Sequence, residues 1–505
     1  MDDRFAAAWS RLPDYLSQHV ILSATALALG LAISLPLAIA AHRNAVVRWP
    51  VMTVASLIQT IPSLALLALF YPILLALSAA MQPIGVTFSA LGFLPSLLAL
   101  TLYSMLPILR NTVAGLAGVD ADVREAARGV GMTERQILTQ VELPLAAPVI
   151  MAGVRTAAVW VIGTATLSTP VGQTSLGNYI FTGLQTANWV FVLFGCAAAA
   201  ALALIVDQLL ALIEGGVGRR EHRRVVIGVA GLALGTIVAL APGFTTTQAT
   251  YSIGAKGFTE QYILAYLIRD ELEERGMSGR RRAGLGSSVI FQALAANEID
   301  VYVDYSGTIW TTQMHRTDQP SREEVLLQMT DWLQEQHGVL ALGALGFENA
   351  YALAMRRERA EQLGVRSISD LARIAPQLAI GGDIEFFGRP EWEALRETYG
   401  LSFKGQRDYQ PTFMYRAVAE GTVDVISAFS SDGRIAAFDL IVLEDDRHAI
   451  PPYDAVLLVA PARAQDEAFL SALRPLVGAI PVEAMREASR MVDRDDDKRS
   501  VRESA

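Results

Sequence analysis

The chain has 505 residues, a formal net charge of −10 and a single cysteine, Cys196. Residues 1–247 carry 13 Lys and Arg against 11 Asp and Glu, whereas the remaining residues carry 28 against 40. Neither part has the basic surplus of a nucleic-acid-binding protein, and one cysteine excludes an internal disulfide or a cysteine-based metal cluster. We therefore expect a membrane-embedded first part and a soluble second part.

Six apolar segments are long enough, at about 17–25 residues, to cross a bilayer as helices. They lie at 20–41, 51–78, 88–109, 147–168, 189–213 and 225–241. Prolines inside them, such as Pro62, are tolerated in a bundle where neighbours bond the freed carbonyls. Arg155 and Asp207 are costly in lipid, and we expect Arg155 to extend toward the interface and Asp207 to face the bundle interior.

The basic residues of the loops between these segments predict the orientation. Arginines occur in the first, third and fifth loops, whereas residues 79–87 and 169–188 contain neither Lys nor Arg. Because cytoplasmic loops carry the positive charge, we expect an outside N-terminus, a cytoplasmic loop at 119–144, and everything after residue 242 outside.

The third loop contains an ordered polar motif. It reads E-A-A-x(3)-G at Glu125, Ala126, Ala127 and Gly131, and it closes with Leu143 and Pro144. Thr133 and Gln136 have the spacing of a capping box, and Pro144 is expected to stop the second helix before the next span. The loop is therefore predicted to form two short helices joined by a sharp turn. Such a loop could be either a solvated connector or a protruding element that binds a partner.

The second part alternates strands and helices after a small, polar linker at 243–250. Strands are predicted at 251–256, 299–305, 346–355, 378–381 and 424–429. Helices are predicted at 259–275, with Thr259 as N-cap, after Ser288, and at 369–374, 390–399 and 412–420. This order predicts α/β layers with mostly parallel sheets, divided into two lobes over 251–490. The charged tail, residues 491–505, is predicted to be disordered.

The loop motif resembles the cytoplasmic loop of permease subunits of binding-protein-dependent ABC importers. There the first short helix docks on the ATPase subunit. The resemblance implies that an ATPase dimer contacts Glu125, Ala126, Ala127, Gly131 and Pro144. No Walker A sequence occurs in the chain, so ATP is expected on a separate polypeptide and no cofactor on this one. A permease domain of six spans, residues 1–242, also implies a homodimer.

Four motifs of the second part resemble substrate-binding proteins for glycine betaine, choline and carnitine. They are AKGFTEQ at 255–261, IDVYVDYSGT at 299–308, LGFENAYAL at 345–353 and DVISAFSSDGR at 424–434. The resemblance implies an all-α membrane bundle of the importer permease type, fused to a two-lobed periplasmic-binding-protein-like domain of type II. It also implies a multi-pass protein of the bacterial plasma (inner) membrane with its binding domain outside.

A trimethylammonium group cannot donate hydrogen bonds, so aromatic ring faces bind it best, at about 0.5–2 kcal/mol per ring. Within the matching motifs, the resemblance implies ligand contacts by Gln261, Asp304, Tyr305, Thr308, Tyr351 and Phe429. The three rings would form the cage. Gln261 would meet a carboxylate or hydroxyl tail near a helix N-terminus.

The charged residues near these motifs leave alternatives open. Asp304 could supply a countercharge or pair with Arg434, and Asp432 and Arg434 could equally form a structural ion pair. Phe429 and Glu348 depart from the family, where tyrosine and asparagine are usual. They leave the ligand open, with ergothioneine as an alternative trimethylammonium compound.

Two other classes of protein would also explain an outer domain on membrane helices. A ligand-gated channel or receptor would need no ATPase-docking loop. An extracellular enzyme would need a catalytic constellation, and the sequence offers neither that nor metal-ligand spacing. We therefore expect a transport subunit that is not itself an enzyme.

Overall fold

The computed structural model describes residues 3–86, 88–186, 188–240, 250–316, 318, 320–493 and 501–505. The chain divides into two compact units, Met1–Phe181 with Val190–Thr247, and Thr182–Trp189 with Gln248–Ala505. Most of the expected linker, residues 243–249, lies outside the described residues, and Thr250 already begins the first strand.

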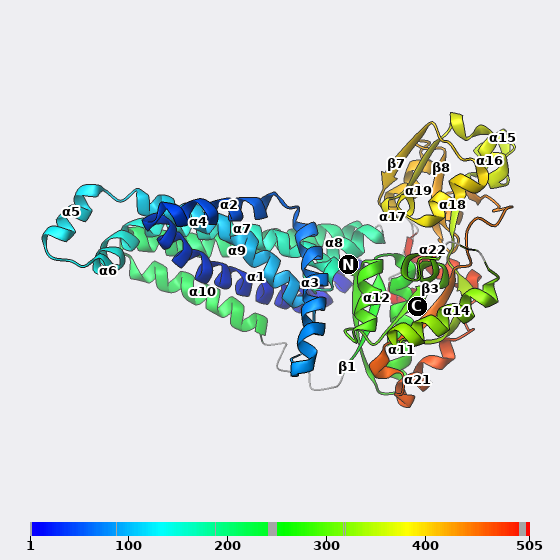
Figure 1. The fold of residues 1–505 in the computed structure, drawn as a ribbon, viewed down its shortest axis with the longest axis horizontal. Coiled ribbons are helices and arrows are strands. Elements are labelled where there is room, and N and C mark those ends of the chain that lie inside the picture. The colour runs from blue at the N-terminus through cyan, green and yellow to red at the C-terminus, as the bar shows by residue number, and fades with distance from the viewer. Residues whose placement is uncertain are drawn as a thin grey trace. The chain divides into compact units, whose positions relative to one another are not determined.

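The first unit is a bundle of helices, coloured blue to green in Figure 1. Within the described residues, six helices are long and apolar enough to cross a membrane, which confirms the predicted number of spans. The helices are α1 (Asp3–Arg43), α2 (Ala45–Thr60), α3 (Ser63–Met81), α4 (Phe93–Ala117), α5 (Ala121–Gly129), α6 (Glu134–Gln136), α7 (Leu143–Ala165), α8 (Gly177–Gln185), α9 (Trp189–Arg219) and α10 (His222–Leu240).

The span predicted at 51–78 is two helices, α2 and α3, so that prediction was wrong. Ile61 is extended (φ −72°, ψ 128°), because the residue before a proline is driven out of the helical region. Pro62 then precedes α3. The Tyr103 hydroxyl donates a hydrogen bond to the Ile61 carbonyl, so the interruption leaves this group satisfied.

Close contacts around α4 depend on glycine. A Cβ at Gly30 of α1 would lie 1.8 Å from the Ser104 Oγ, and one at Gly153 of α7 would lie 2.7 Å from the Pro107 carbonyl oxygen. Both helices therefore approach α4 at positions where any side chain would clash, as is common between membrane helices.

Arg155, which we expected from the sequence to extend toward the membrane interface, forms ion pairs with two carboxylates of α9. It lies near the middle of α7, and its Nε and Nη2 each donate to one carboxylate oxygen of Asp207 on α9, both at 2.9 Å. Its Nη1 donates to Glu214 Oε2 at 2.7 Å. The guanidinium therefore joins α7 to α9 through two carboxylates.

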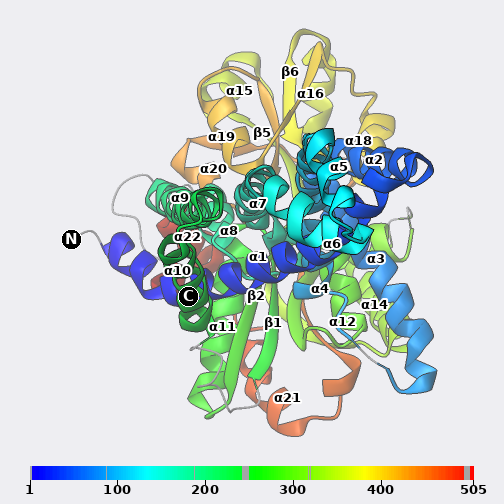
Figure 2. The ribbon, with the colours of Figure 1, turned by 90° about the vertical axis from the view of Figure 1, so that its left-hand side faces the viewer.

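The loop between α4 and α7 forms two short helices, as predicted, and they stand at one end of the helical unit (Figures 1 and 2). Asp120 caps α5 by accepting from the Asp122 backbone N–H at 2.9 Å. The capping box of Thr133 and Gln136 at α6 is confirmed. Pro144 does not stop this helix, however. A π-helical turn at Ile137–Glu142 leads directly into α7, because a wider turn accommodates the hydrogen bond that proline cannot make.

The second unit has two lobes, each built on a five-stranded sheet (Figures 1 and 2). The sheet of lobe 1 has the order β2-β1-β3-β10-β4, and the sheet of lobe 2 has the order β7-β6-β8-β5-β9. The strands are β1 (Thr250–Lys256), β2 (Ser278–Leu285), β3 (Val301–Tyr305), β4 (Leu340–Glu348), β5 (Tyr351–Arg356), β6 (Ala379–Asp383), β7 (Gly405–Tyr409), β8 (Val425–Phe429), β9 (Leu440–Val442) and β10 (Asp454–Val459).

Two predictions about these sheets need correction. The sheets are mixed rather than mostly parallel, because β10 pairs antiparallel with β3 and β4, and β5 pairs antiparallel with β8 and β9. The strand predicted at 346–355 is two strands. β4 ends at Glu348 in lobe 1 and β5 begins at Tyr351 in lobe 2, so Asn349 and Ala350 carry the chain between the lobes.

Helices flank both sheets. They are α11 (Thr259–Glu274), α12 (Ser287–Ala295), α13 (Ser306–Thr308), α14 (Arg322–His337), α15 (Arg357–Leu363), α16 (Ile368–Ile374), α17 (Ile384–Phe387), α18 (Pro390–Tyr399), α19 (Pro411–Ala419), α20 (Arg434–Ala437), α21 (Glu467–Leu473), α22 (Val482–Asp493) and α23 (Val501–Ser504). One cluster of buried apolar side chains extends through both lobes, from Ile253 and Val303 in lobe 1 to Leu353 and Val425 in lobe 2.

The start of α11 and the end of α22 differ from the prediction. Phe258, not Thr259, occupies the N-cap of α11, and the Thr259 hydroxyl instead donates to Asp493 Oδ1 at 2.7 Å. Residues 491–493, predicted to begin a disordered tail, complete α22, where Val492 and Asp493 are buried. Residues 501–504 are also helical, whereas 494–500 lie outside the described residues.

Candidate functional site

Four aromatic rings form a continuous series where the two lobes meet. Tyr305 ends β3 and Phe258 precedes α11, both in lobe 1, and their ring centroids are 6.2 Å apart. Phe258 stacks on Phe429 of lobe 2 with centroids 6.1 Å apart and planes within 3°. Phe429 in turn lies 5.1 Å from Tyr351. The structure therefore brings the three predicted rings into one cluster, and the fourth ring, Phe258, links them.

Sheet register explains why Tyr351 and Phe429 meet. Tyr351 is the first residue of β5 and Phe429 is the last of β8, and the antiparallel pairing sets them directly opposite each other. Cross-strand aromatic pairs of this kind stabilise sheets. The sequence motifs predict each ring separately at a strand end. That the two rings lie opposite each other follows only from the register of β5 and β8.

Two further rings surround Tyr351, and neither was predicted from the sequence. Phe386 of α17 lies 5.1 Å from Tyr351, and Tyr453, just before β10, lies 6.0 Å away with its plane at 88°. Both are fully or almost fully buried. Both residues lie outside the four recognised motifs, so the sequence offered no reason to select them.

The ring faces already lie against positive charge within the protein. The Arg389 Cζ lies 5.4 Å from the centroid of Tyr351, and the Lys256 Nζ lies 5.4 Å from the centroid of Tyr305. Such contacts are attractive because the face of an aromatic ring is electronegative. Tyr351 and Tyr305 therefore each already contact a cationic side chain of the protein.

A buried carboxylate, Glu260, connects both lobes beside these rings. Its Oε1 accepts from the Tyr305 hydroxyl at 2.5 Å and from Asn349 Nδ2 at 3.2 Å, and its Oε2 accepts from the Ser431 hydroxyl of lobe 2. Burial raises the pKa of Glu260 to about 7, although the hydrogen bonds from Ser431, Tyr305 and Asn349 favour the ionised form. Sequence reasoning did not single out Glu260, although it belongs to the motif at 255–261.

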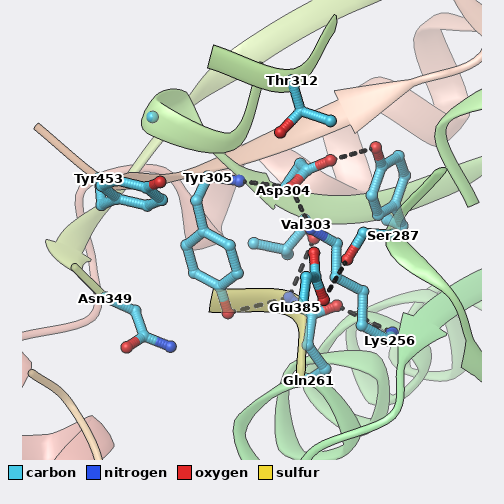
Figure 3. A network of polar contacts seen from close by, with 12 residues as sticks. Lys256, Gln261, Ser287, Val303, Asp304, Tyr305, Thr312, Asn349, Glu385 and Tyr453 are labelled. Carbon is cyan, nitrogen blue, oxygen red and sulfur yellow. Dashed lines mark hydrogen bonds and ion pairs between the residues drawn. The ribbon is translucent and has the colours of Figure 1, made fainter. Parts of the chain in front are cut away.

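Asp304 lies in an internal network of lobe 1 (Figure 3). Its Oδ1 contacts the Lys256 Nζ at 2.5 Å, and its Oδ2 accepts from the Tyr302 hydroxyl at 2.5 Å. Asp304 thus pairs with Lys256 rather than with Arg434, which was one of the two possibilities left open from the sequence, because Asp304 lies in β3 and Lys256 ends the neighbouring parallel strand β1. Arg434 instead pairs with Asp432 at 2.5 Å.

Gln261 is oriented by the same part of lobe 1. Its Nε2 donates to the Val303 carbonyl and to the Tyr305 hydroxyl, each at 3.0 Å, and its Oε1 accepts from the Lys256 backbone N–H at 3.2 Å. Gln261 therefore fixes the phenol of Tyr305, which Figure 3 shows directed toward it. Thr308 is buried in α13.

A cavity of about 380 Å³ adjoins Tyr351. Glu348, one of the two departures from the family pattern, contributes to its wall and pairs with Arg322. The lining residues are Pro320, Arg322, Glu348, Ala350, Tyr351, Asp445, His448, Ile450, Pro451 and Pro452. Its volume falls in the range of about 300–1,000 Å³ that is usual for small-molecule sites.

The loop motif presents a compact surface at the end of the helical unit. Glu125 and Ala126 are exposed on α5, whereas Ala127 is buried. Gly131 has φ +84°, a conformation that favours glycine and permits the reversal between the helices. Arg128 Nε donates to Glu134 Oε1 across this turn at 2.9 Å. The motif residues other than Pro144 therefore belong to the protruding part, and Pro144 to the base of α7.

Comparison with known proteins assigns a family to each unit. Residues 249–505 match the family described as Substrate binding domain of ABC-type glycine betaine transport system. Residues 30–219 match the family described as Binding-protein-dependent transport system inner membrane component.

One relative matches parts of both units, and others match one unit. An ergothioneine transport permease/ergothioneine binding protein of Helicobacter pylori (strain G27) is 28% identical over 436 residues, or 83% of this chain and 76% of the relative. The choline transport system permease protein of Bacillus subtilis (strain 168) is 39% identical over 197 residues, 39% of this chain and 84% of its own length. The crystal structure of a glycine betaine/carnitine/choline ABC transporter covers 50% of this chain and 95% of its own, at 25% identity and a TM-score of 0.45.

Proposed function

Because the chain belongs to the ABC importer family whose binding domains serve glycine betaine transport, fused here to an importer permease, we propose that it imports a quaternary amine such as glycine betaine, choline or carnitine. The observation that carries this proposal is the ring series Tyr305, Phe258, Phe429 and Tyr351 at the junction of the lobes. A trimethylammonium group offers no hydrogen-bond donor, so stacked ring faces are its natural binding surface.

The lobes supply the closing motion that an importer requires. Contacts across the junction join side chains from both lobes, including Phe258 with Phe429 and Glu260 with Ser431. A ligand held between the rings would stabilise the closed arrangement, since ligands favour whichever conformation binds them better. Hinge movement would occur at the two places where the chain crosses between the lobes, Asn349 with Ala350 and residues 443–453.

A second candidate ligand is ergothioneine. The Helicobacter pylori relative is named for it, and the cavity of about 380 Å³ beside Tyr351 offers room for a ligand portion beyond the ammonium group. Arg322 and His448 in the cavity wall could meet a carboxylate or a heterocycle there.

The proposal also includes ATP as the energy source and a dimer of this chain as the assembly. A separate ATPase dimer would bind α5 around Glu125 on the cytoplasmic side, and two copies of this chain would form the translocation path. The alternating arginine loops support an outside N-terminus and an outside binding domain. A ligand-gated channel with the same outer domain would have no use for the exposed motif on α5.

Binding measurements on residues 250–505, which contain both sheets and their core, test the ligand class. Isothermal titration calorimetry should detect binding of at least one of glycine betaine, choline, carnitine and ergothioneine. The matched controls are glycine and ethanolamine, which lack the methyl groups and should bind at least tenfold more weakly. Absence of binding by all four trimethylammonium compounds would refute the proposal.

A further inference from the structure

Three partly exposed ionisable side chains of the helical unit meet between α7 and α9. The Arg155 guanidinium donates to both oxygens of Asp207 at 2.9 Å and to Glu214 at 2.7 Å. The cluster contains one more carboxylate than guanidinium, so it carries a surplus negative charge. Because Nε, Nη1 and Nη2 of Arg155 already donate to these carboxylates, the cluster offers mainly acceptors to any further group.

A cavity of about 390 Å³ opens beside this cluster. Its lining residues are Ala152, Arg155, Thr156, Val159, Trp160 and Asp207. Trp160 is 48% exposed and supplies an indole, the side chain whose face attracts cations most strongly. The cavity wall thus combines an indole with a carboxylate that the Arg155 guanidinium, also part of the wall, already holds. The surplus negative charge of the cluster comes from Glu214, which pairs with the same guanidinium.

The face of α7 that carries the cluster is not the face packed in the bundle. Val154, Ala157, Ala158 and Val161 are buried, whereas the side chains of Arg155 and Asp207 remain 29% and 21% exposed. Charged groups at mid-membrane are costly against lipid and typically line aqueous paths. The position of Arg155 near the middle of a membrane-crossing helix therefore indicates that this face borders the solute path.

We propose that the cavity beside Trp160 and Asp207 is a second solute site, which binds the quaternary ammonium group as it crosses the membrane. This inference rests on the proposed function, since it assumes that the solute carries that group. The indole holds the methylated ammonium, and the surplus carboxylate charge compensates its positive charge.

Uptake by the full chain with its ATPase subunit in proteoliposomes tests the aromatic part of the site. Trp160→Ala should lower the maximal rate of choline uptake at least fivefold, while choline binding to the detergent-purified full chain stays unchanged. Trp160→Phe, which keeps a ring, should retain more than half of the rate. Trp189→Ala is the matched control, because Trp189 is 47% exposed on α9 and should transport as wild type does.

A charge variant tests whether the negative charge of the cluster acts on the solute. It is measured by the ratio of choline uptake to glycine betaine uptake, which a purely structural role of the cluster would leave unchanged. Glu214→Gln removes the surplus charge and leaves the bidentate Arg155–Asp207 pair in place. Choline is a cation and glycine betaine is a zwitterion, so choline uptake should fall at least threefold relative to glycine betaine uptake. An equal change for both solutes would mean that the cluster only fastens α7 to α9, and would overturn the inference.

The remaining outcomes separate this inference from the proposed function. Wild-type uptake by Trp160→Ala, or equal loss in Trp160→Phe and Trp160→Ala, would overturn the inference alone while solute binding persists. If the wild-type full chain bound no trimethylammonium compound, the proposed function would fail and this inference with it.

Discussion

Phe258 and Phe429 stack across the two lobes with ring planes 3° apart and centroids 6.1 Å apart. Phe258 stands just before α11 in lobe 1, and Phe429 ends β8 in lobe 2. The Phe258–Phe429 stacking therefore exists only while the two lobes are in contact. It also connects Tyr305 in lobe 1 to Tyr351 in lobe 2.

Tyr351 has ring neighbours on several sides, so its loss should affect binding directly. We expect Tyr351→Ala to weaken trimethylammonium binding to residues 250–505 at least tenfold, about 1.4 kcal/mol. Tyr351→Phe keeps the ring and should stay within threefold of wild type. Calorimetry measures both, and an unchanged affinity of Tyr351→Ala would remove this residue from the binding surface.

Asp304 should be essential for stability whatever the ligand. Asp304→Asn leaves Lys256 buried without its countercharge, since the two side chains are 0% and 5% exposed. Breaking such a buried pair costs about 3–5 kcal/mol. Urea denaturation of residues 250–505 should show this loss. The control Glu393→Gln breaks an exposed pair with Arg396 and should cost no more than about 1 kcal/mol. Equal effects of the two variants would contradict the role of burial.

Glu260 should make the stability of the binding domain depend on pH. Its folded-state pKa is about 7, raised by burial above the ordinary value of 4.5. The folded state therefore favours the protonated carboxyl, and the stabilisation is present below about pH 4.5 and lost as the pH rises through 7. The melting temperature of Glu260→Gln relative to wild type should increase between pH 5 and pH 8. A difference that stays constant across this range would refute the prediction.

Glu125 should matter for transport and not for solute capture. It is exposed on α5, where the proposed ATPase docks, so Glu125→Gln should lower uptake at least tenfold. Solute binding to the purified full chain should not change. Glu221→Gln, in the turn between α9 and α10, alters another exposed carboxylate paired with Arg224 and should transport normally. Normal uptake by Glu125→Gln would exclude the coupling role.

The sequence predicted the elements with strong local signals and missed those set by distant partners. The six spans followed from apolar length, and the capping box of Thr133 and Gln136 from short-range chemistry. The sequence predicts that neighbours bond the carbonyl freed near Pro62, and Tyr103 does so. It does not predict that the helix is interrupted there, between α2 and α3.

The binding region shows the same division. Tyr305, Tyr351 and Phe429 were identified from their motifs. Phe258 lies in the motif at 255–261 but was not singled out there, and Tyr453 lies in none of the four motifs; both rings join the cluster through tertiary packing. The partner of Asp304 stayed open from the sequence because it depends on which strands are neighbours in the sheet, and strand order cannot be read from spacing along the chain.

The path of the chain through the two lobes sets an order for biosynthesis. All five strands of lobe 2 lie between Tyr351 and Val442, whereas β10, which stands between β3 and β4 in lobe 1, ends at Val459. Lobe 2 can therefore complete its sheet as it leaves the ribosome, while lobe 1 keeps two strand edges unpaired until its last strand is synthesised. Domains usually fold from the N-terminus onward during synthesis. Here the lobe that starts first must finish last.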